Sequence, residues 1–477
     1  MNILQHIEHL RSLTGTKDKK AYLATLKDNP NFLSFVHLTL EPLTNMYMTE
    51  LPDGVGVPGH TNEFNEDEFI VDLTELVGKL TNRTLSKRLE VANAIQGFIN
   101  KHANVTSWDL LDLVVRRTLS AGLAEKSIND VFGEHFLTLV PYQRCVLPKD
   151  SNIRKWTMKD GRWETVKLSQ IKADGEYANV TLGSEGLKVQ TRNGRLFPVR
   201  SADGQIIQAW AGLNADMVAR YNDMKGMQLH GELMIEGPDG KLMSRAEGNG
   251  VFNSLLKQGS EIPEGHRVVM HVWDAIPLEN AVSKGRYDMP YIERFGFVNR
   301  VFAGGKTITP IETRMVWTVG EALDHLREAL ARGLEGTVLK ASNAIWRDGD
   351  NPDQIKFKIE FTVDLILTAF KAGDANGKNA STFGSMELES SDGLLKVSAT
   401  GISDKDRAEL HKNKAKYIGG VFKVTANDIM APSRDNDKHS LFLPRVNIKT
   451  FRVDKAEADD LPSIIAQLEA AKANYTI

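Results

Sequence analysis

The chain has 477 residues, 41% of them hydrophobic and 25% charged, which is enough apolar material for the cores of about three domains. A net charge of −3 excludes a uniformly basic coat protein for nucleic acid, although local cations could still bind phosphate. The single cysteine, Cys145, excludes an intrachain disulfide and a thiolate metal site. The sequence has no signal-peptide core and no apolar run of about 18 residues, so we expect a soluble, cytoplasmic protein without a membrane partner.

Residues 1–140 are expected to form a helical domain, because their apolar residues recur at helical spacing. The clearest of these helices runs from Leu110 to Leu119, where Ser107 could cap the start and Gly122 could mark the end.

Arg116 and Arg117 are neighbours in that helix and point about 100° apart, so at least one should reach solvent. The pair belongs either to an ordinary solvated surface or to a phosphate-binding one.

Residues 141–362 are expected to form an α+β domain with mixed or antiparallel sheets. Alternating apolar residues predict strands at 177–182, 229–236, 268–273 and 336–340, and helical spacing predicts a helix at 319–332. Residues 363–477 are expected to form a small β-barrel, with a hairpin turn at 390–393 and a last helix at 461–473.

Lys172 begins a Lys-Ala-Asp-Gly string in which aspartate and glycine suit a tight turn that projects the lysine. A lysine amine attacks phosphorus once nearby cations or desolvation lower its pKa. Such a string occurs by chance in roughly one chain in ten of this length, so alone it could be a plain turn between strands.

Six further segments follow this string in a fixed order. They are Thr191-Arg-Asn-Gly, Leu229-His-Gly-Glu-Leu, Val272-Trp-Asp, Leu334-Glu-Gly-Thr-Val-Leu-Lys, Lys356-Phe-Lys and Phe451-Arg-Val-Asp-Lys. The ordered set resembles the motifs of the covalent nucleotidyltransferase superfamily, which contains ATP-dependent DNA ligases and mRNA-capping enzymes. The helical N-terminal region, which capping enzymes lack, narrows the resemblance to the ATP-dependent DNA ligases of T-even bacteriophages.

This resemblance implies three domains: a helical DNA-binding domain at 1–140, an ATP-grasp-like nucleotidyltransferase domain at 141–362 and an OB-fold at 363–477. It implies that Lys172 takes AMP from ATP with Mg²⁺, or Mn²⁺ in its place, and that the AMP then activates a 5′-phosphate at a nick in duplex DNA. The expected enzyme is a monomer that encircles DNA and acts in replication, repair and recombination, in the host cytoplasm if the source is viral.

The same resemblance assigns roles to individual residues. Lys340, Lys356 and Lys358 would bind the nucleotide, and the last two share one face of a strand because they are two residues apart. Glu232 and Glu335 would bind the metal or, for Glu232, the nucleotide. The alternative for either glutamate is an ordinary surface residue.

Trp273 would stack on adenine, unless it is simply a core tryptophan, and Gln170 and Ile171 would read the adenine edge. Arg192 would hold the nucleotide or the nick phosphate in a bidentate grip. Arg116 and Arg117 would contact DNA. In the last domain, Arg452 and Lys455 would orient pyrophosphate.

Two positions depart from the ligase pattern. Tyr177 stands where relatives usually have an arginine that contacts the nucleotide, and His230 replaces an acidic residue before Gly-Glu. Tyrosine can donate a hydrogen bond but has no charge at pH 7. An RNA ligase, a capping-type nucleotidyltransferase and a catalytically inactive DNA-binding protein are the alternative functions.

Overall fold

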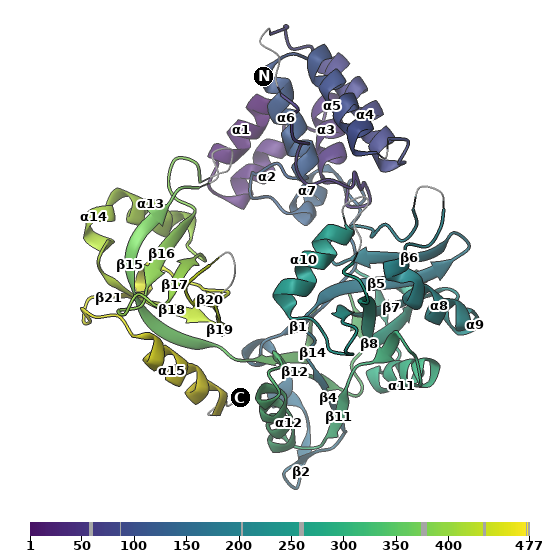
Figure 1. Ribbon diagram of the computed structural model, residues 1–477, viewed down its shortest axis with the longest axis vertical. Helices are drawn as coiled ribbons and strands as arrows, with labels where there is room; N and C mark the ends of the chain where they lie inside the picture. Colours follow the sequence, from purple (N-terminus) through teal and green to yellow (C-terminus); the bar gives the residue numbers. More distant parts are fainter. Residues whose placement is uncertain are drawn as a thin grey trace. The chain divides into compact units, whose positions relative to one another are not determined.

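A computed structural model of the chain describes residues 1–56, 61–85, 87–201, 204–256, 262–373, 379–432, 436–473 and 475, with residues 245 and 246 described in their backbone only. The chain divides into two compact units (Figure 1). Unit 1 comprises residues 1–317 and 338–355, and unit 2 comprises residues 318–337 and 356–477.

The first part of unit 1 is helical, as the sequence predicts. Asparagine side chains cap several of these helices: the Asn2 side chain, for example, accepts a hydrogen bond from the Gln5 amide at 3.0 Å. The helices pack around a core of their own that includes Ile7, Phe35 and Leu73. They are α1 (Ile3–Ser12), α2 (Thr16–Ala24), α3 (Pro30–Leu40), α4 (Glu66–Thr81), α5 (Arg88–Lys101), α6 (Val105–Arg116) and α7 (Glu125–Phe132).

The bounds of α6 differ from the sequence prediction at both ends. The cap is Asn104, whose side chain accepts a hydrogen bond from the Thr106 amide at 2.8 Å, whereas Ser107 is buried inside the helix. The helix ends before Gly122 because Arg117 takes a left-handed conformation with φ of 55°. The expectation that one of the two arginines reaches solvent is confirmed, since Arg116 is exposed.

Two five-stranded sheets form the centre of unit 1. The first has the order β1-β14-β12-β4-β11 and the second the order β10-β8-β7-β5-β6. Both are mixed rather than purely antiparallel, because β1 pairs with β14 and β10 with β8 in parallel. Their strands are β1 (Gln143–Val146), β4 (Lys167–Ile171), β5 (Glu176–Gly183), β6 (Gly186–Thr191), β7 (Met227–Glu236), β8 (Arg267–Pro277), β10 (Ile308–Pro310), β11 (Thr313–Val316), β12 (Gly336–Ala341) and β14 (Gly349–Lys358).

The four strands that the sequence predicts in this region fall within β5, β7, β8 and β12. The remaining elements are the helices α8 (Ala211–Ala219), α9 (Tyr221–Met224), α10 (Arg245–Leu255) and α11 (Tyr291–Phe302), and the short strands β2 (Met158–Lys159), β3 (Arg162–Trp163), β9 (Arg286–Tyr287) and β13 (Trp346–Arg347).

A buried ion pair joins α11 to β8. The Arg294 guanidinium donates to both carboxylate oxygens of Asp274 at 2.8 and 3.0 Å, and the two side chains are 0% and 2% exposed. Arg294 also donates to the carbonyl oxygen of Ala344 at 3.0 Å. These bonds offset the cost of burying the two charges.

Unit 2 combines α12 (Val319–Ala331) with an antiparallel sheet of order β17-β16-β15-β18-β21. The predicted helices at 319–332 and 461–473 and the hairpin around 390–393 are confirmed. The elements are β15 (Phe361–Lys371), β16 (Ser385–Glu389), β17 (Lys396–Ala399), α13 (Asp404–Lys412), α14 (Lys414–Tyr417), β18 (Val421–Ala426), β19 (Asp428–Met430), β20 (Ser440–Phe442), β21 (Phe451–Arg452) and α15 (Leu461–Ala473).

The predicted barrel is not closed within the described part of unit 2. Isolated bridges instead link Leu395 to His439, and Arg445 to both Thr400 and Thr425. The segment 439–445 therefore touches the sheet at its two ends, while β20 between them pairs with β19 and not with the sheet.

Among the helices of the described ranges, none combines the length and apolar character that crossing a bilayer requires.

We expect Arg294→Met to lower the free energy of unfolding by about 3–5 kcal/mol, because it leaves Asp274 buried without its partner. Urea denaturation measures this loss. The double variant Asp274→Asn with Arg294→Met should recover part of it, since no buried charge remains unpaired. An equal loss in both variants would contradict the role given to the ion pair.

Candidate active site

Lys172 lies directly after β4, every residue of which is buried. The β4 strand pairs with β11, and the Ile171 amide donates to the Glu312 carbonyl at 3.1 Å, so the strand is fixed up to its last residue. Residues 172–175 then carry the chain from the first sheet to the second, where β5 begins. The predicted position of the lysine at a strand end is confirmed, and the chain bends at Gly175 before β5 begins.

This turn requires glycine at position 175. A Cβ atom there would overlap the Leu233 carbonyl and the Met234 sulfur. The close approach lets the Gly175 amide donate to Glu232 Oε1 at 3.2 Å. This hydrogen bond holds the segment that begins at Lys172 next to Glu232 on β7.

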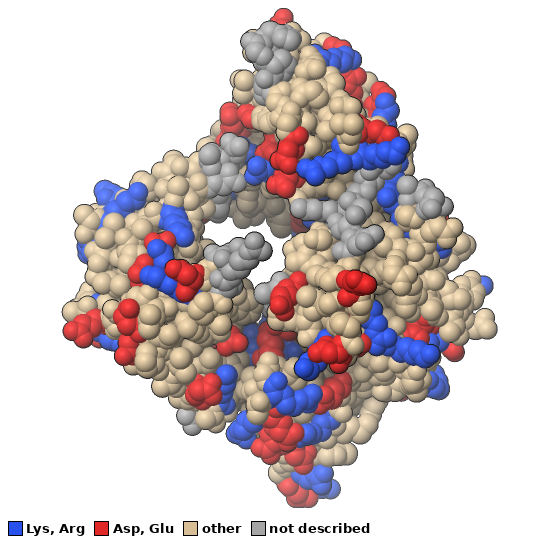
Figure 2. Space-filling view, in the orientation of Figure 1, with Lys and Arg blue, Asp and Glu red and all other residues tan. Residues whose placement is uncertain are grey.

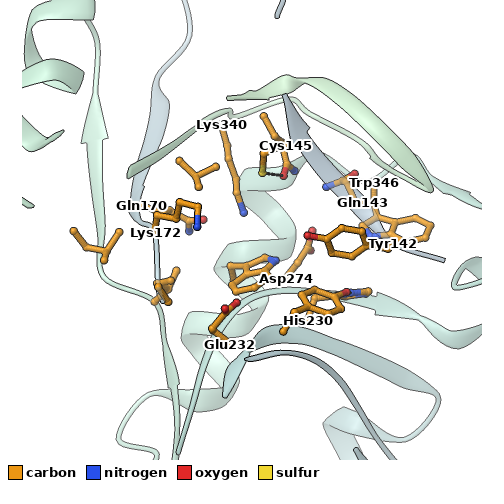
Figure 3. Close-up of a pocket in the computed structure, with 17 residues that line it drawn as sticks. Tyr142, Gln143, Cys145, Gln170, Lys172, His230, Glu232, Asp274, Lys340 and Trp346 are labelled. Atoms are coloured by element: carbon orange, nitrogen blue, oxygen red, sulfur yellow. Dashed lines mark hydrogen bonds between the residues drawn. The ribbon is translucent and has the colours of Figure 1, made fainter. Parts of the chain in front are cut away.

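A cavity of about 120 Å³ opens beside Lys172. Both sheets line it, and the lining includes five aromatic side chains: Tyr142, Tyr177, His230, Trp273 and Trp346. In Figure 3, Lys172 and Gln170 lie on one side of the cavity, and Tyr142 and Trp346 lie on the other. A flat, apolar and partly enclosed space of this kind suits a nucleobase, with polar groups at its edge to orient it.

A buried hydrogen-bonded chain fixes Gln170 at the edge of this cavity. Thr313 Oγ1 donates to the Ile311 carbonyl at 2.9 Å, so it accepts from Gln170 Nε2 at 3.0 Å. The Gln170 carbonyl oxygen then faces the Tyr291 hydroxyl at 2.8 Å. Lys340 completes the chain by donating to the Tyr291 oxygen at 3.0 Å.

Tyr291 is a residue of this hydrogen-bonded chain that the sequence did not predict. It lies at the start of α11, outside every ordered segment, and only the fold brings its hydroxyl to Gln170, Lys340 and the Trp273 carbonyl, the last at 2.7 Å. A helix-starting tyrosine gives no signal in the sequence that distinguishes it from a core residue.

Lys340 is a buried cation without a carboxylate partner in the described part of the chain. Its ammonium lies 4.4 Å from the centre of the Tyr291 ring and 5.7 Å from that of Trp273, so ring faces and one hydroxyl stabilise it. Burial lowers the pKa of Lys340 to about 8. Lys340 therefore remains mostly charged near neutral pH and loses its charge at mildly alkaline pH.

The two departures from the ligase pattern touch each other. The Tyr177 oxygen lies 2.8 Å from His230 Nδ1 and 2.7 Å from Asn179 Oδ1. Burial raises the pKa of the Tyr177 hydroxyl and lowers the pKa of His230 to about 4, so both groups are neutral at pH 7.

Several predicted site residues gather at this cavity, and others do not. Gln170, Ile171, Lys172, Glu232, Trp273 and Lys340 line it. The guanidinium of Arg192 lies 4.3 Å from the ring centre of Tyr142, a lining residue, but Arg192 itself is exposed and outside the lining.

The two predicted DNA-binding arginines, Arg116 and Arg117, lie in the helical part of unit 1. Arg116 pairs with Asp112 at 2.9 Å. Arg117 donates to the Glu41 carbonyl, and burial together with the nearby Arg195 lowers the pKa of Arg117 to about 10.

The other predicted residues lie in unit 2. Lys358 pairs with Glu360 at 3.3 Å, and both Lys356 and Lys358 are half-buried at the end of β14. Arg452 and Lys455 both bind Asp364, at 2.7 and 2.9 Å. Glu335 is half-buried just before β12.

No cluster of three or more acidic, histidine or cysteine side chains that could hold a metal occurs among the described residues. Two acidic residues, Glu232 and Asp274, line the cavity, and the Asp274 carboxylate is already paired with Arg294. Mg²⁺ usually binds one or two carboxylates together with waters and substrate phosphates, so this donor set fits a metal that arrives with its nucleotide.

Comparisons with known proteins give the class of this fold and site. Residues 158–358, which carry the Lys172 turn, Glu232 and Lys340, match the family of the ATP-dependent DNA ligase domain. Residues 158–358 thus form an ATP-dependent DNA ligase domain, and the chain as a whole is similar to DNA ligases.

Within that class it is similar to the DNA ligases of two enterobacteria phages. It is 25% identical to the phage T4 enzyme over 97% of this chain and 98% of that protein, and 24% identical to the phage T6 enzyme over the same shares. A solved structure described as Pmar-Lig_PreS3 has the same fold, with a TM-score of 0.65, 20% identity and coverage of 95% of this chain and 99% of that one.

The pKa of Lys340 leads to a test of its unusual environment. The unfolded chain binds a proton at this lysine up to about pH 10.5 and the folded chain only up to about pH 8, so the unfolding free energy should rise with pH between these values. Lys340→Met should remove this rise, and should be more stable than the parent at pH 7 by roughly 1–3 kcal/mol. Denaturant unfolding between pH 7 and 10.5 measures both effects. If the unfolding free energies of the parent and of Lys340→Met change with pH in the same way, Lys340 is not a buried cation with a lowered pKa.

Proposed function

We propose that the protein seals nicks in duplex DNA that carry a 5′-phosphate and a 3′-hydroxyl, through an AMP bound covalently to Lys172. The observation that carries the proposal is the position of Lys172. It begins a glycine-dependent turn that is hydrogen-bonded to Glu232, beside a cavity lined with aromatic rings and within a DNA ligase domain.

The reaction has three displacements at phosphorus. The neutral amine of Lys172 attacks the α-phosphorus of ATP, forming a P–N bond as pyrophosphate leaves. An oxygen of the 5′-phosphate at the nick then attacks the same phosphorus, breaks the P–N bond and returns the amine. Finally the 3′-hydroxyl attacks the 5′-phosphorus, the strand is closed and AMP leaves. Such steps need positioned reactants and neutralised charge more than further covalent help.

The residues at the cavity divide these tasks between them. We assign base recognition to Trp273, Gln170 and Ile171, because a ring face and polar edge groups both border the cavity. Lys340 supplies positive charge. Mg²⁺, or Mn²⁺ in its place, would be held by Glu232 and would neutralise charge on the nucleotide phosphates.

The residues of unit 2 keep the roles that the resemblance gives them. We propose nucleotide contacts for Lys356, Lys358, Arg452 and Lys455, and metal binding for Glu335. The carboxylate partners of Arg452 and Lys455 support this assignment in one respect: these cations already bind oxyanions.

We further propose a three-domain organisation, with DNA binding by residues 1–140, nucleotidyl transfer by 141–362 and an OB-fold at 363–477. Three separate hydrophobic clusters support it, one in the helices, one in the two central sheets and one formed mainly by residues after 358. The enzyme would act as a monomer that encircles nicked DNA, in replication, repair and recombination in the cytoplasm. A nuclease footprint confined to one face of the duplex would contradict encirclement.

We propose that a few individual arginines contact DNA, and not a continuous positively charged surface. On the face drawn in Figure 2, basic and acidic side chains are interspersed. We assign DNA phosphate contacts to Arg116, Arg117 and Arg192.

Replacing Lys172 with alanine should abolish AMP attachment and leave binding of nicked DNA largely unchanged, because only the nucleophile is removed. Intact mass after incubation with ATP and Mg²⁺ measures the first, and a gel-shift assay measures the second. GTP in place of ATP, and a nicked RNA duplex in place of DNA, test the capping and RNA-ligase alternatives. If the unaltered protein gains no AMP, the enzyme assignment is wrong and an inactive DNA-binding protein remains.

Arg192→Ala should weaken binding of nicked DNA and reduce the slope of log affinity against log salt by about 1, because one phosphate contact is lost. Arg300→Ala, an exposed arginine on α11, serves as the matched control and should leave the slope unchanged. Equal slopes for Arg192→Ala and the parent protein would remove Arg192 from the DNA interface.

A further inference from the structure

His230 is a buried polar residue that the ligase motifs leave without a role. It lies on β7, is 2% exposed and lines the cavity beside Lys172 (Figure 3). Its Nε2 atom is buried and has no hydrogen-bond partner among the described residues. Burying a polar atom without a partner costs free energy, so such an atom in a cavity wall indicates a ligand that supplies the partner.

The hydrogen bonds of Tyr177 determine what Nε2 can offer. In the amide orientation of this structure, Asn179 presents its Oδ1 atom to the Tyr177 hydroxyl at 2.7 Å, and the single hydroxyl proton is then donated to Asn179. The contact of 2.8 Å to His230 must then use an N–H on Nδ1 that donates to the Tyr177 oxygen. A neutral imidazole with its proton on Nδ1 has a lone pair on Nε2. His230 therefore presents an acceptor and requires a donor from the ligand.

The position of His230 selects the part of the nucleotide that can supply this donor. His230 and Glu232 are two residues apart on β7 and both line the cavity, and Glu232 holds the turn that begins at Lys172. The nucleotide phosphorus must reach Lys172, and its ribose is one ester bond away. The polar side chain suited to the base edge, Gln170, belongs to a separate hydrogen-bonded chain on the β4 side.

We propose that His230 Nε2 accepts a hydrogen bond from a ribose hydroxyl of the bound ATP. His230 is then a nucleotide-binding residue, and Tyr177 is a positioning residue that fixes its tautomer. This inference rests on the proposed use of ATP by Lys172 and extends it to the recognition of the sugar.

The proposal also explains why the two departures from the ligase pattern occur together. Tyr177 does not take over an arginine's contact itself, since Asn179 and His230 occupy its hydroxyl. An arginine at 177 would place an unneutralised cation beside a neutral histidine in a buried wall. Tyrosine at 177 and histidine at 230 form a neutral pair that keeps one acceptor directed at the sugar.

The test is self-adenylylation of the full-length protein without DNA, followed by intact mass, with ATP, 2′-deoxyATP and 3′-deoxyATP. The parent protein should react with ATP with a second-order rate constant roughly tenfold above that for the analogue that lacks the contacted hydroxyl, the usual effect of one hydrogen bond. His230→Phe should lose this preference by raising the ATP concentration that gives the half-maximal rate of AMP attachment, while the maximal rate changes little. His230→Gln, whose amide oxygen can accept, should restore much of it.

Tyr177→Phe keeps the ring and removes the hydroxyl that orients His230. Its preference for ATP over the same analogue should fall about threefold, which also serves as the test if His230→Phe fails to fold. His102→Phe removes another buried histidine, one bonded to Asp72 in the helical part, and should leave the preference unchanged.

Failure of the parent protein to gain AMP would overturn the proposed function. Normal AMP attachment by the parent, with the same preferences for both hydroxyls in His230→Phe, would overturn only the sugar contact. The sugar contact is also wrong if His230→Phe instead loses its preference for ATP over purine riboside triphosphate, because the donor would then be the adenine amino group.

Discussion

The site depends on one close approach, between Gly175 in the segment that joins the two central sheets and the backbone of β7. The absence of a Cβ atom there lets the turn after β4 lie against the backbone of β7, and the Gly175 amide then bonds to Glu232. A larger residue would separate the lysine from the glutamate and widen the space that the aromatic rings enclose. The contact lies next to the first pair of the β5–β7 ladder, Glu176 with Leu233, and Lys172 and Glu232 on its two sides both line the cavity.

The sequence predicted the parts of the site that lie on strands and turns better than those that depend on tertiary contact. The strand positions, the Lys172 turn and the cavity residues Gln170, Glu232, Trp273 and Lys340 follow from local alternation and ordered motifs. Tyr291 could not be predicted, because its role arises only where α11 packs on β8 and reaches β4. The start of α6 was misplaced for a related reason: both Asn104 and Ser107 can cap a helix, and the burial of Ser107 within the core decided between them. The barrel was expected from short strands alone, but closure depends on pairing at the sheet edges, which composition does not determine.

The electrostatics of the cavity are unusual for a protein that handles a polyanion. Lys340 is its one fully buried cation within the described residues, and it is stabilised by aromatic faces and a hydroxyl rather than by a carboxylate. The charge of Asp274, which lines the cavity, is neutralised by Arg294 outside the lining. The basic residues that line the cavity are therefore Lys172 and Lys340, while Tyr177 and His230 on its aromatic side are neutral at pH 7.

This neutrality bears on how a ligase can replace an arginine with a tyrosine. A charged arginine holds a nucleotide through long-range attraction and several donors, whereas the Tyr177–His230 pair offers a single acceptor with a fixed direction. Such a pair contributes little to attraction of the triphosphate. It does discriminate between ligands that carry a hydrogen-bond donor facing His230 Nε2 and ligands that do not. Recognition at this wall thus shifts from the charge of the nucleotide to the hydroxyl pattern of its sugar, and the phosphates are left to the lysines.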